Sequence, residues 1–344
     1  MTLFRYELAQ SHRILDLIVR DLAGDQLHHK VPGSSINPIA AIYMHAIFSE
    51  DNFIHRVCQS RPPLFEGEGW LGRTLRDLDP QKQNVCTGVS FGLGLPRAMY
   101  LPGTPAISIA HLEGYGLLTS LAGSEQRAAV NAFTRMYAPE EFGEASLIMG
   151  HLGQTGRDAL VGADMLKVAP QRYKSTVEYG GDPLSQSLKG IAQVHLAGIG
   201  TRVFYAQHGG YDVHGSQLQT QPKLWSQVSR AVNDFFADLR QHAAAENLIM
   251  MIFSEFGRRV RDNGNGTDHG SGGGAFVIGE RVKGGLYAEY PSLDPAKQAS
   301  GDLAFNNDFR SLYTTVLEGW FGLNAAPIVN GSFEKFTGLV KTAA

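Results

Sequence analysis

Two apolar runs separated by a long amphipathic stretch constrain the fold of this chain more than any other feature of its sequence. The runs at residues 202–207 (RVFYAQ) and 248–253 (LIMMIF) are typical of parallel strands covered on both faces. Between them, residues 224–239 repeat apolar side chains at helical spacing, which predicts a helix of about 20 residues. The pattern therefore predicts a parallel β-α-β unit and an α/β fold. A further strand is predicted at residues 275–279.

The first part of the chain has a different period. Apolar side chains recur at helical spacing over residues 4–22 and again from 39 to 57, where Asn37 and Pro38 suit the start of a helix. The proline- and glycine-rich stretch at residues 61–72 interrupts this period. We therefore predict two parts, a helical hairpin over residues 1–66 and an α/β domain over residues 67–344 on which the hairpin packs.

Composition excludes several classes of protein. Thirty basic against 33 acidic residues give a net charge of −3, so we expect neither nucleic acid nor an anionic membrane as a partner. The longest apolar runs are far shorter than the roughly 20 residues of a membrane-spanning helix. The first ten residues lack the pattern of a secretory signal, so the chain as written is expected to be cytoplasmic. Two cysteines, Cys58 and Cys86, are interpreted as reduced buried thiols rather than a disulfide.

Potential metal ligands follow the predicted strands. Asp212 and His214 lie in a glycine-rich loop after the first strand, and Asp268 and His269 lie in a second such loop. Open α/β sheets bind ligands beyond the carboxyl ends of their strands, so we expect these side chains to converge. Mixed oxygen and nitrogen donors favour Zn, Mn or Fe over Ca. The alternative is that these residues are solvated turn formers.

Three charged residues follow the second predicted strand. Glu255 is a candidate metal ligand or general base, or else the partner of an arginine in an ion pair. Arg258 and Arg259 are candidates for binding the oxyanion of a phosphate or sulfate substrate, or else are surface charges. The sequence contains no phosphate-binding GxxxxGK[ST] loop, so a nucleotide site is not expected.

The order of these motifs resembles a known family. The segments GGYDVH (209–214), SEFGRR (254–259), GTDHG (266–270), VKGG (282–285) and DFRS (308–311) are similar to the family called domain of unknown function 1501, from about residue 69 to about residue 333. That family resembles the alkaline phosphatase and sulfatase superfamily, whose members use two metal ions in ester hydrolysis. The resemblance implies an alkaline-phosphatase-like, mostly parallel sheet flanked by helices. It also implies divalent metal ions bound by Asp212, His214, Glu255 and His269, with Asp268 as a ligand or a supporting partner.

One part of the family pattern is missing. Members usually begin with a strand and a Gly-Gly-x-Asp segment near the nucleophile, often behind an export signal. The Gly-Gly-Asp at residues 180–182 precedes Pro183 without an apolar strand and is interpreted as a turn. Residues 37–45 are instead similar to the second helix of DinB-like bundles, in which His45 matches a metal ligand by position. The HxxxH pair of those bundles is absent, so His45 is interpreted as an exposed or rim histidine.

Three functions follow from these observations. The first is a metal-dependent hydrolase of small anionic phosphate or sulfate esters, weak or inactive because the N-terminal segment that should supply a metal carboxylate and lie near the nucleophile is missing. The second is a non-catalytic binding or structural protein on the same scaffold. The third, a DinB-like metal or thiol-transfer enzyme, would need two more histidines from a partner chain.

Overall fold

The computed structural model describes residues 68–92, 94–112, 123–125, 128, 131, 147–254, 256–299 and 301–341. The chain divides into two compact units, residues 1–67 with 139–152 and residues 68–138 with 153–344. The predicted hairpin over residues 1–66, with His45 and Cys58, lies outside the described residues, and so does Glu255.

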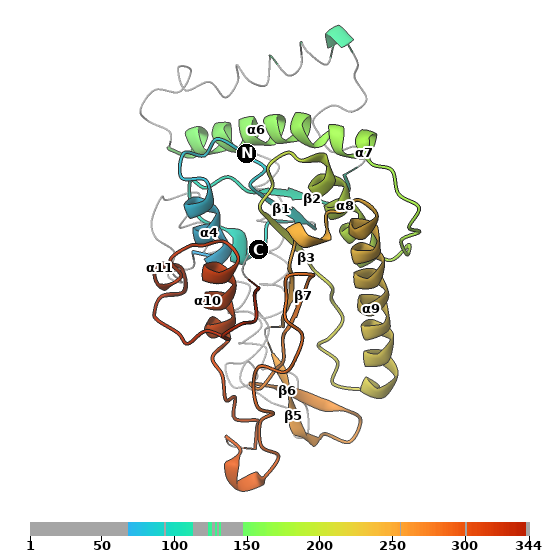
Figure 1. Ribbon diagram of the computed structural model, residues 1–344, viewed down its shortest axis with the longest axis vertical. Coiled ribbons are helices and arrows are strands. Elements are labelled where there is room, and N and C mark those ends of the chain that lie inside the picture. Colours follow the sequence, from blue (N-terminus) through green and yellow to red (C-terminus); the bar gives the residue numbers. More distant parts are fainter. Residues whose placement is uncertain are drawn as a thin grey trace, which may run out of the picture. The chain divides into compact units, whose positions relative to one another are not determined.

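The described residues form both helices and strands (Figure 1). The strands are β1 (Gly88–Phe91), β2 (Ile107–Ile109), β3 (Val203–Ala206), β4 (Met250–Ile252), β5 (Gly257–Asp262), β6 (Thr267–Gly270) and β7 (Phe276–Ile278). The helices are α4 (Trp70–Leu78), α6 (Leu147–Leu166), α7 (Val168–Arg172), α8 (Pro183–Ala197), α9 (Gln217–Gln241), α10 (Phe309–Gly319) and α11 (Ala326–Val329). None of the described helices has the length and apolar character needed to cross a membrane.

A small parallel sheet lies at the centre of the second unit. Its strand order is β2-β1-β3, and Val89 of β1 is in register with Ile107 on one side and Phe204 on the other. All four residues of β1 are buried, as a central strand covered on both faces requires. The predicted first strand is thus confirmed as β3, and the fold is mixed α/β.

The predicted partner of β3 is wrong. Residues 250–252 form β4, but this strand pairs antiparallel with β7 in a separate two-stranded sheet, and β5 pairs antiparallel with β6 in another. The described sheets are therefore not mostly parallel. The physical reason is that an apolar run reports burial of side chains, whereas its pairing depends on which backbone lies beside it. The predicted strand at 275–279 is confirmed as β7, and the predicted long helix is confirmed as α9.

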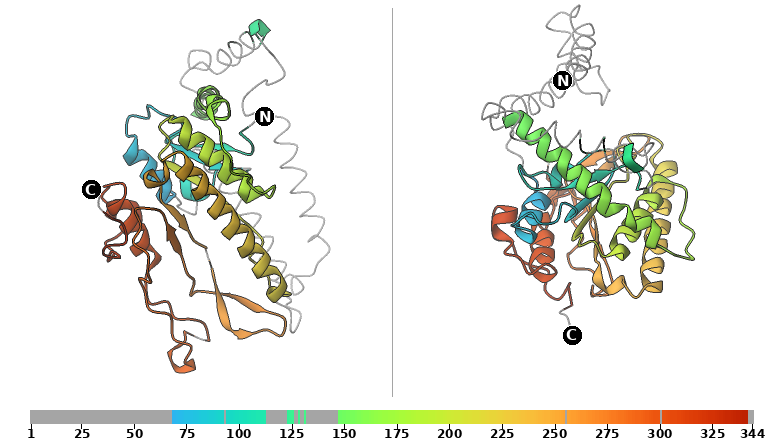
Figure 2. Two further views of the ribbon diagram at one scale, coloured as in Figure 1. Left: turned by 45° about the vertical axis from the view of Figure 1, so that its right-hand side comes forward. Right: turned by 90° about the horizontal axis from the view of Figure 1, so that it is seen from above.

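Helices cover both faces of the parallel sheet (Figures 1 and 2). On one face α4 approaches β1 so closely that a Cβ at Gly88 would lie 2.5 Å from Leu75 Cδ1. On the other face α8 packs against β1, where a Cβ at Gly190 would overlap the ring of Phe91. Both glycines therefore permit close helix–strand packing.

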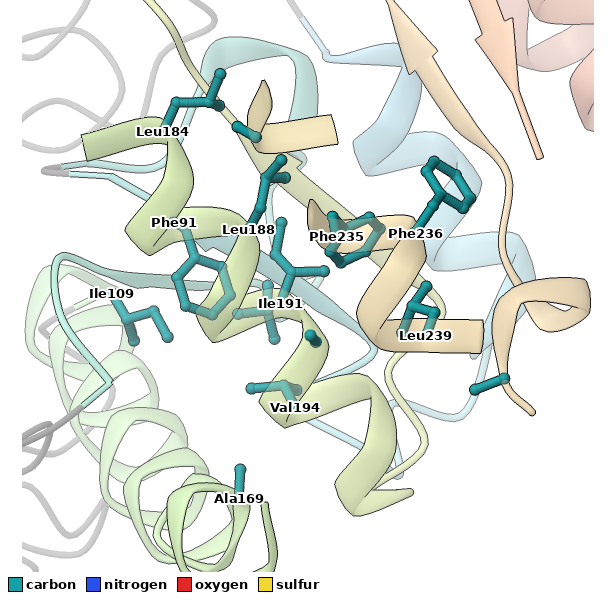
Figure 3. Close-up of a cluster of buried hydrophobic side chains, with 14 of the residues drawn as sticks. Phe91, Ile109, Ala169, Leu184, Leu188, Ile191, Val194, Phe235, Phe236 and Leu239 are labelled. Carbon is teal, nitrogen blue, oxygen red and sulfur yellow. The ribbon is translucent and has the colours of Figure 1, made fainter. Parts of the chain in front are cut away.

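The main core lies between the parallel sheet and the pair α8 and α9 (Figure 3). Apolar side chains of α8 and α9 meet those of β1 and β2 there, and Figure 3 labels Phe91, Ile109, Leu184, Leu188, Ile191, Val194, Phe235, Phe236 and Leu239 among them. Cys86 belongs to the same cluster as a free, fully buried thiol, and its burial raises the pKa of the thiol to about 12. The interpretation of Cys86 as a reduced buried thiol is confirmed.

The Gly-Gly-Asp segment has a structural role. Asp182 is the N-cap of α8, and its carboxylate accepts hydrogen bonds from the backbone N–H of Ser185 at 3.0 Å and from the hydroxyl of Ser185 at 2.7 Å. Pro183 occupies the first turn, where its missing N–H costs nothing. Arg230 of α9 donates to the same carboxylate at 2.8 Å, so this cap also joins the two helices.

Candidate metal centre

Two segments that are distant in sequence build the candidate site. One is the glycine-rich loop between β3 and α9, which carries Asp212 and His214. The other is the β5-β6 hairpin, which carries Asp268 and His269 on β6. In this hairpin Arg258 of β5 is in register with His269. His269 therefore lies within a strand and not in a loop after one, which corrects the expected route to convergence.

The structure brings Asp212, His214 and His269 together. One potential ligand atom from each residue lies within 4.8 Å of the others, close to the maximum of about 4.5 Å for two ligands that share one cation. Asp212 and His269 are exposed and His214 is partly buried, so the cluster is accessible from solvent. The rings of the two histidines are nearly perpendicular, at 79°, with centroids 5.2 Å apart.

His214 contacts a carboxylate at each ring nitrogen. Its Nδ1 lies 3.0 Å from Oδ1 of Asp268, and its Nε2 lies 2.9 Å from Oδ1 of Asp212. When the proton is on Nδ1, the imidazole donates to Asp268 and presents the Nε2 lone pair to Asp212. Two acceptors at this separation repel each other unless a proton or a metal cation lies between them. The donor set therefore fits a divalent cation.

Asp268 supports this arrangement. Besides the contact with His214, its Oδ1 accepts a hydrogen bond from Asn263 Nδ2 at 3.0 Å. The hydrogen bond with His214, followed by that from Asn263, lowers the pKa of Asp268 below its usual value. A carboxylate on the second ring nitrogen fixes the tautomer and orientation of a metal-binding histidine. Of the two roles predicted for Asp268, the geometry favours the supporting partner.

Further polar residues, to which the sequence pattern assigned no role, join the hairpin to the loop. Asn263 also donates to the carbonyl of His214 at 3.1 Å, and Asn265 accepts from the backbone N–H of Ser216 at 3.2 Å. Gln217 Oε1 at the start of α9 accepts from the backbone N–H of Thr267 at 2.6 Å. The sequence could have indicated these contacts only through the asparagines in the glycine-rich turn. Turn formation alone explains asparagines at such positions equally well.

The two arginines predicted to bind substrate differ in their surroundings. Arg258 is partly buried, and its guanidinium donates to the carbonyl oxygens of Thr267 and Tyr211. Arg259 is exposed, and its positive charge contributes to lowering the pKa of Asp268 and of Asp302. Arg259 thus remains the more accessible of the two for an anionic ligand.

Comparison with known proteins gives one family. A family model described as "Protein of unknown function (DUF1501)" matches residues 59–328, which is most of the chain and includes all the candidate site residues. Neither the curated proteins nor the solved structures give a match.

Proposed function

The chain belongs to the DUF1501 family, and we propose that it binds a divalent metal ion through Asp212, His214 and His269 and has the site of a phosphate or sulfate ester hydrolase. The single observation that carries the proposal is His214, whose two ring nitrogens each face a carboxylate, one of them within a cluster of possible ligands. Two imidazoles and one carboxylate favour Zn, Mn or Fe. The resemblance to the alkaline phosphatase and sulfatase superfamily is part of this proposal.

Each residue of the site has a distinct role in this proposal. Asp212, His214 and His269 hold the cation, Asp268 orients His214, and the exposed Arg259 attracts the anionic ester. A bound divalent cation would supply Lewis acidity to a phosphoryl or sulfuryl oxygen. Glu255 is proposed as a further ligand or general base from its position in the sequence.

We propose that turnover is weak or absent. Among the residues that the structure describes, one cluster of potential ligands is found. In-line displacement of the superfamily type uses two cations and an aligned nucleophile. The same observation favours the alternative, a non-catalytic protein that binds a metal ion or an anionic ligand on this scaffold.

Metal binding and turnover are tested separately. The full chain, freed of metal with a chelator, is titrated with Zn²⁺ and Mn²⁺ by calorimetry, and its metal content is measured after dialysis. We expect one ion per chain in the wild type and none in Asp212→Asn or His269→Ala. Matched controls are Asp234→Asn on α9 and His111→Ala after β2, which lie outside the cluster. Equal binding by the cluster variants and the wild type would overturn the proposed site.

Turnover of p-nitrophenyl phosphate and p-nitrophenyl sulfate by the metal-loaded chain then distinguishes the functions. We expect at most slow hydrolysis, which Asp212→Asn abolishes. Hydrolysis at an ordinary enzymatic rate of about 10 per second would contradict the weak-turnover proposal. Metal binding without any hydrolysis would favour the non-catalytic alternative.

A further inference from the structure

The side chain of Arg258 connects the two segments that carry the candidate ligands. Its Nη1 donates to the carbonyl oxygen of Thr267 at 2.6 Å, and its Nη2 donates to the carbonyl oxygen of Tyr211. Thr267 directly precedes Asp268, and Tyr211 directly precedes Asp212. The side chain of Arg258 therefore binds the carbonyl group directly before Asp212 in one segment and the carbonyl group directly before Asp268 in the other.

The carbonyl of Tyr211 has a further role in shaping the site. It also accepts a hydrogen bond from the backbone N–H of Val213 at 2.9 Å, which closes a three-residue turn with Asp212 at its centre. The direction of the Asp212 side chain depends on this turn. Arg258 binds the turn at its accepting oxygen, from a strand 47 residues later in the chain.

The chemistry of arginine suits this position. A guanidinium has donors fixed in one plane, so a single group can hold two carbonyls in a defined geometry. The group is partly buried and lies 5.4 Å from the ring centroid of Phe256, which limits its freedom. The backbone of Arg258 is also in register with His269, so the same residue is linked to the third ligand.

We propose that Arg258 is a positioning residue for the metal site: it fixes the loop at Asp212 and His214 against the strand that carries Asp268 and His269. This inference rests on the proposed function, because it assumes that these residues bind a cation. In this proposal Arg258 binds backbone carbonyl groups of the protein and not the substrate anion. Arg259 is then the arginine that binds the anion.

The charge of Arg258 and its hydrogen bonds to the two segments have opposite expected effects on metal affinity. The positive charge of a guanidinium near a cation site repels the cation, so removal of the charge by itself strengthens metal binding. Loss of the connection between the two segments instead weakens binding, because the ligands are no longer held in place. The sign of the change in affinity therefore separates the two effects.

The experiment compares Arg258→Met and Arg258→Lys with the control Arg261→Met, at an exposed arginine of the same strand, in the full chain. Dissociation constants for Zn²⁺ and Mn²⁺ are measured by calorimetry. We expect Arg258→Met to weaken binding by about 10- to 100-fold, as is typical when a partner that orients metal ligands is lost. Arg258→Lys should also weaken binding, because an ammonium group lacks the planar fork. Arg261→Met should bind as tightly as the wild type or more tightly.

Hydrogen exchange of the metal-free protein provides a second readout. We expect faster amide exchange at residues 211–216 and 266–270 in Arg258→Met, and unchanged exchange there in Arg261→Met. If circular dichroism shows that Arg258→Met does not fold, Arg258→Lys alone is compared with the wild type. Unchanged or tighter metal binding together with unchanged exchange in the Arg258 variants would overturn the inference. If the wild type binds neither ion, the proposed function fails, and the exchange data alone decide whether Arg258 connects the segments.

Discussion

At the scale of single residues, His214 is the centre of the candidate site. Its two ring nitrogens lie 2.9 Å and 3.0 Å from carboxylate oxygens of Asp212 and Asp268. The two carboxylates differ in their other contacts, because Asp268 also accepts a hydrogen bond from Asn263. This difference is why Asp212 is the candidate ligand and Asp268 the residue that orients His214.

The role of Asp268 leads to a graded prediction. Asp268→Ala removes the acceptor for His214 Nδ1, so we expect metal affinity to fall by about 10- to 100-fold. Asp268→Asn keeps an acceptor oxygen but loses the negative charge, so its affinity should lie between Ala and wild type. Calorimetric titration with Zn²⁺ measures both.

The matched control for Asp268 lies in the same hairpin. Asp262 of β5 is an exposed carboxylate whose side chain accepts from the backbone N–H of Gly264. Asp262→Asn removes the same charge and should change the metal affinity much less. Equal losses in Asp262→Asn and Asp268→Asn would show that general electrostatics, rather than orientation of His214, determines the affinity.

At the scale of elements, the cap of α8 stabilises the scaffold without taking part in the site. Burial alone would raise the pKa of Asp182, but the hydrogen bonds from Ser185 and from Arg230 outweigh it and lower the pKa below its usual value. A carboxyl whose pKa is lowered by folding contributes stability at pH values above its unfolded pKa of about 3.9, and this contribution is lost as the pH falls through the folded pKa.

We expect Asp182→Ala to lower the free energy of unfolding by about 1 kcal/mol, the typical cost of losing an N-cap. Asp182→Asn retains a good capping side chain and should lose less. Urea unfolding at neutral pH measures both values, and the difference from wild type should shrink below about pH 4, where the carboxyl begins to protonate. Metal affinity should be unchanged in both variants. A loss of metal binding in Asp182→Asn would instead place the Gly-Gly-Asp segment in the functional site.

At the scale of the whole molecule, metal binding and folding stability are linked. The candidate ligands come from segments on either side of α9, β4 and β5, so the ligand set exists in the folded chain and not in the unfolded one. A cation that binds only the native state stabilises it by RT ln(1 + [L]/Kd).

We therefore expect free Zn²⁺ or Mn²⁺ at 100 times its dissociation constant to raise the free energy of unfolding by about 2.7 kcal/mol. A chelator should reverse the effect. His269→Ala should unfold with the same free energy in the presence and absence of the ion, because one ligand is missing. Stabilisation that persists in His269→Ala would show that the ion binds elsewhere on the chain.

Part of this fold could be predicted from the sequence because some elements carry a strong local signal. The apolar stripe on α9 and the apolar runs at β3 and β7 were sufficient to locate these elements. β1 and β2, with four and three residues, are too short for a periodic pattern to stand out, although they form most of the parallel sheet. The central strand of the sheet was therefore missed.

The sequence by itself identified the candidate metal ligands, from the spacing of Asp212 and His214 and from the pair Asp268 and His269, and it predicted the family that the family model then matched. Only the tertiary structure decided that β4 pairs with β7, that Asp268 faces His214, and that Arg258 binds two backbone carbonyls. The physical reason is that residue type and period reflect local burial and chemical character. Strand pairing and side-chain contacts instead depend on segments that meet only when the chain folds.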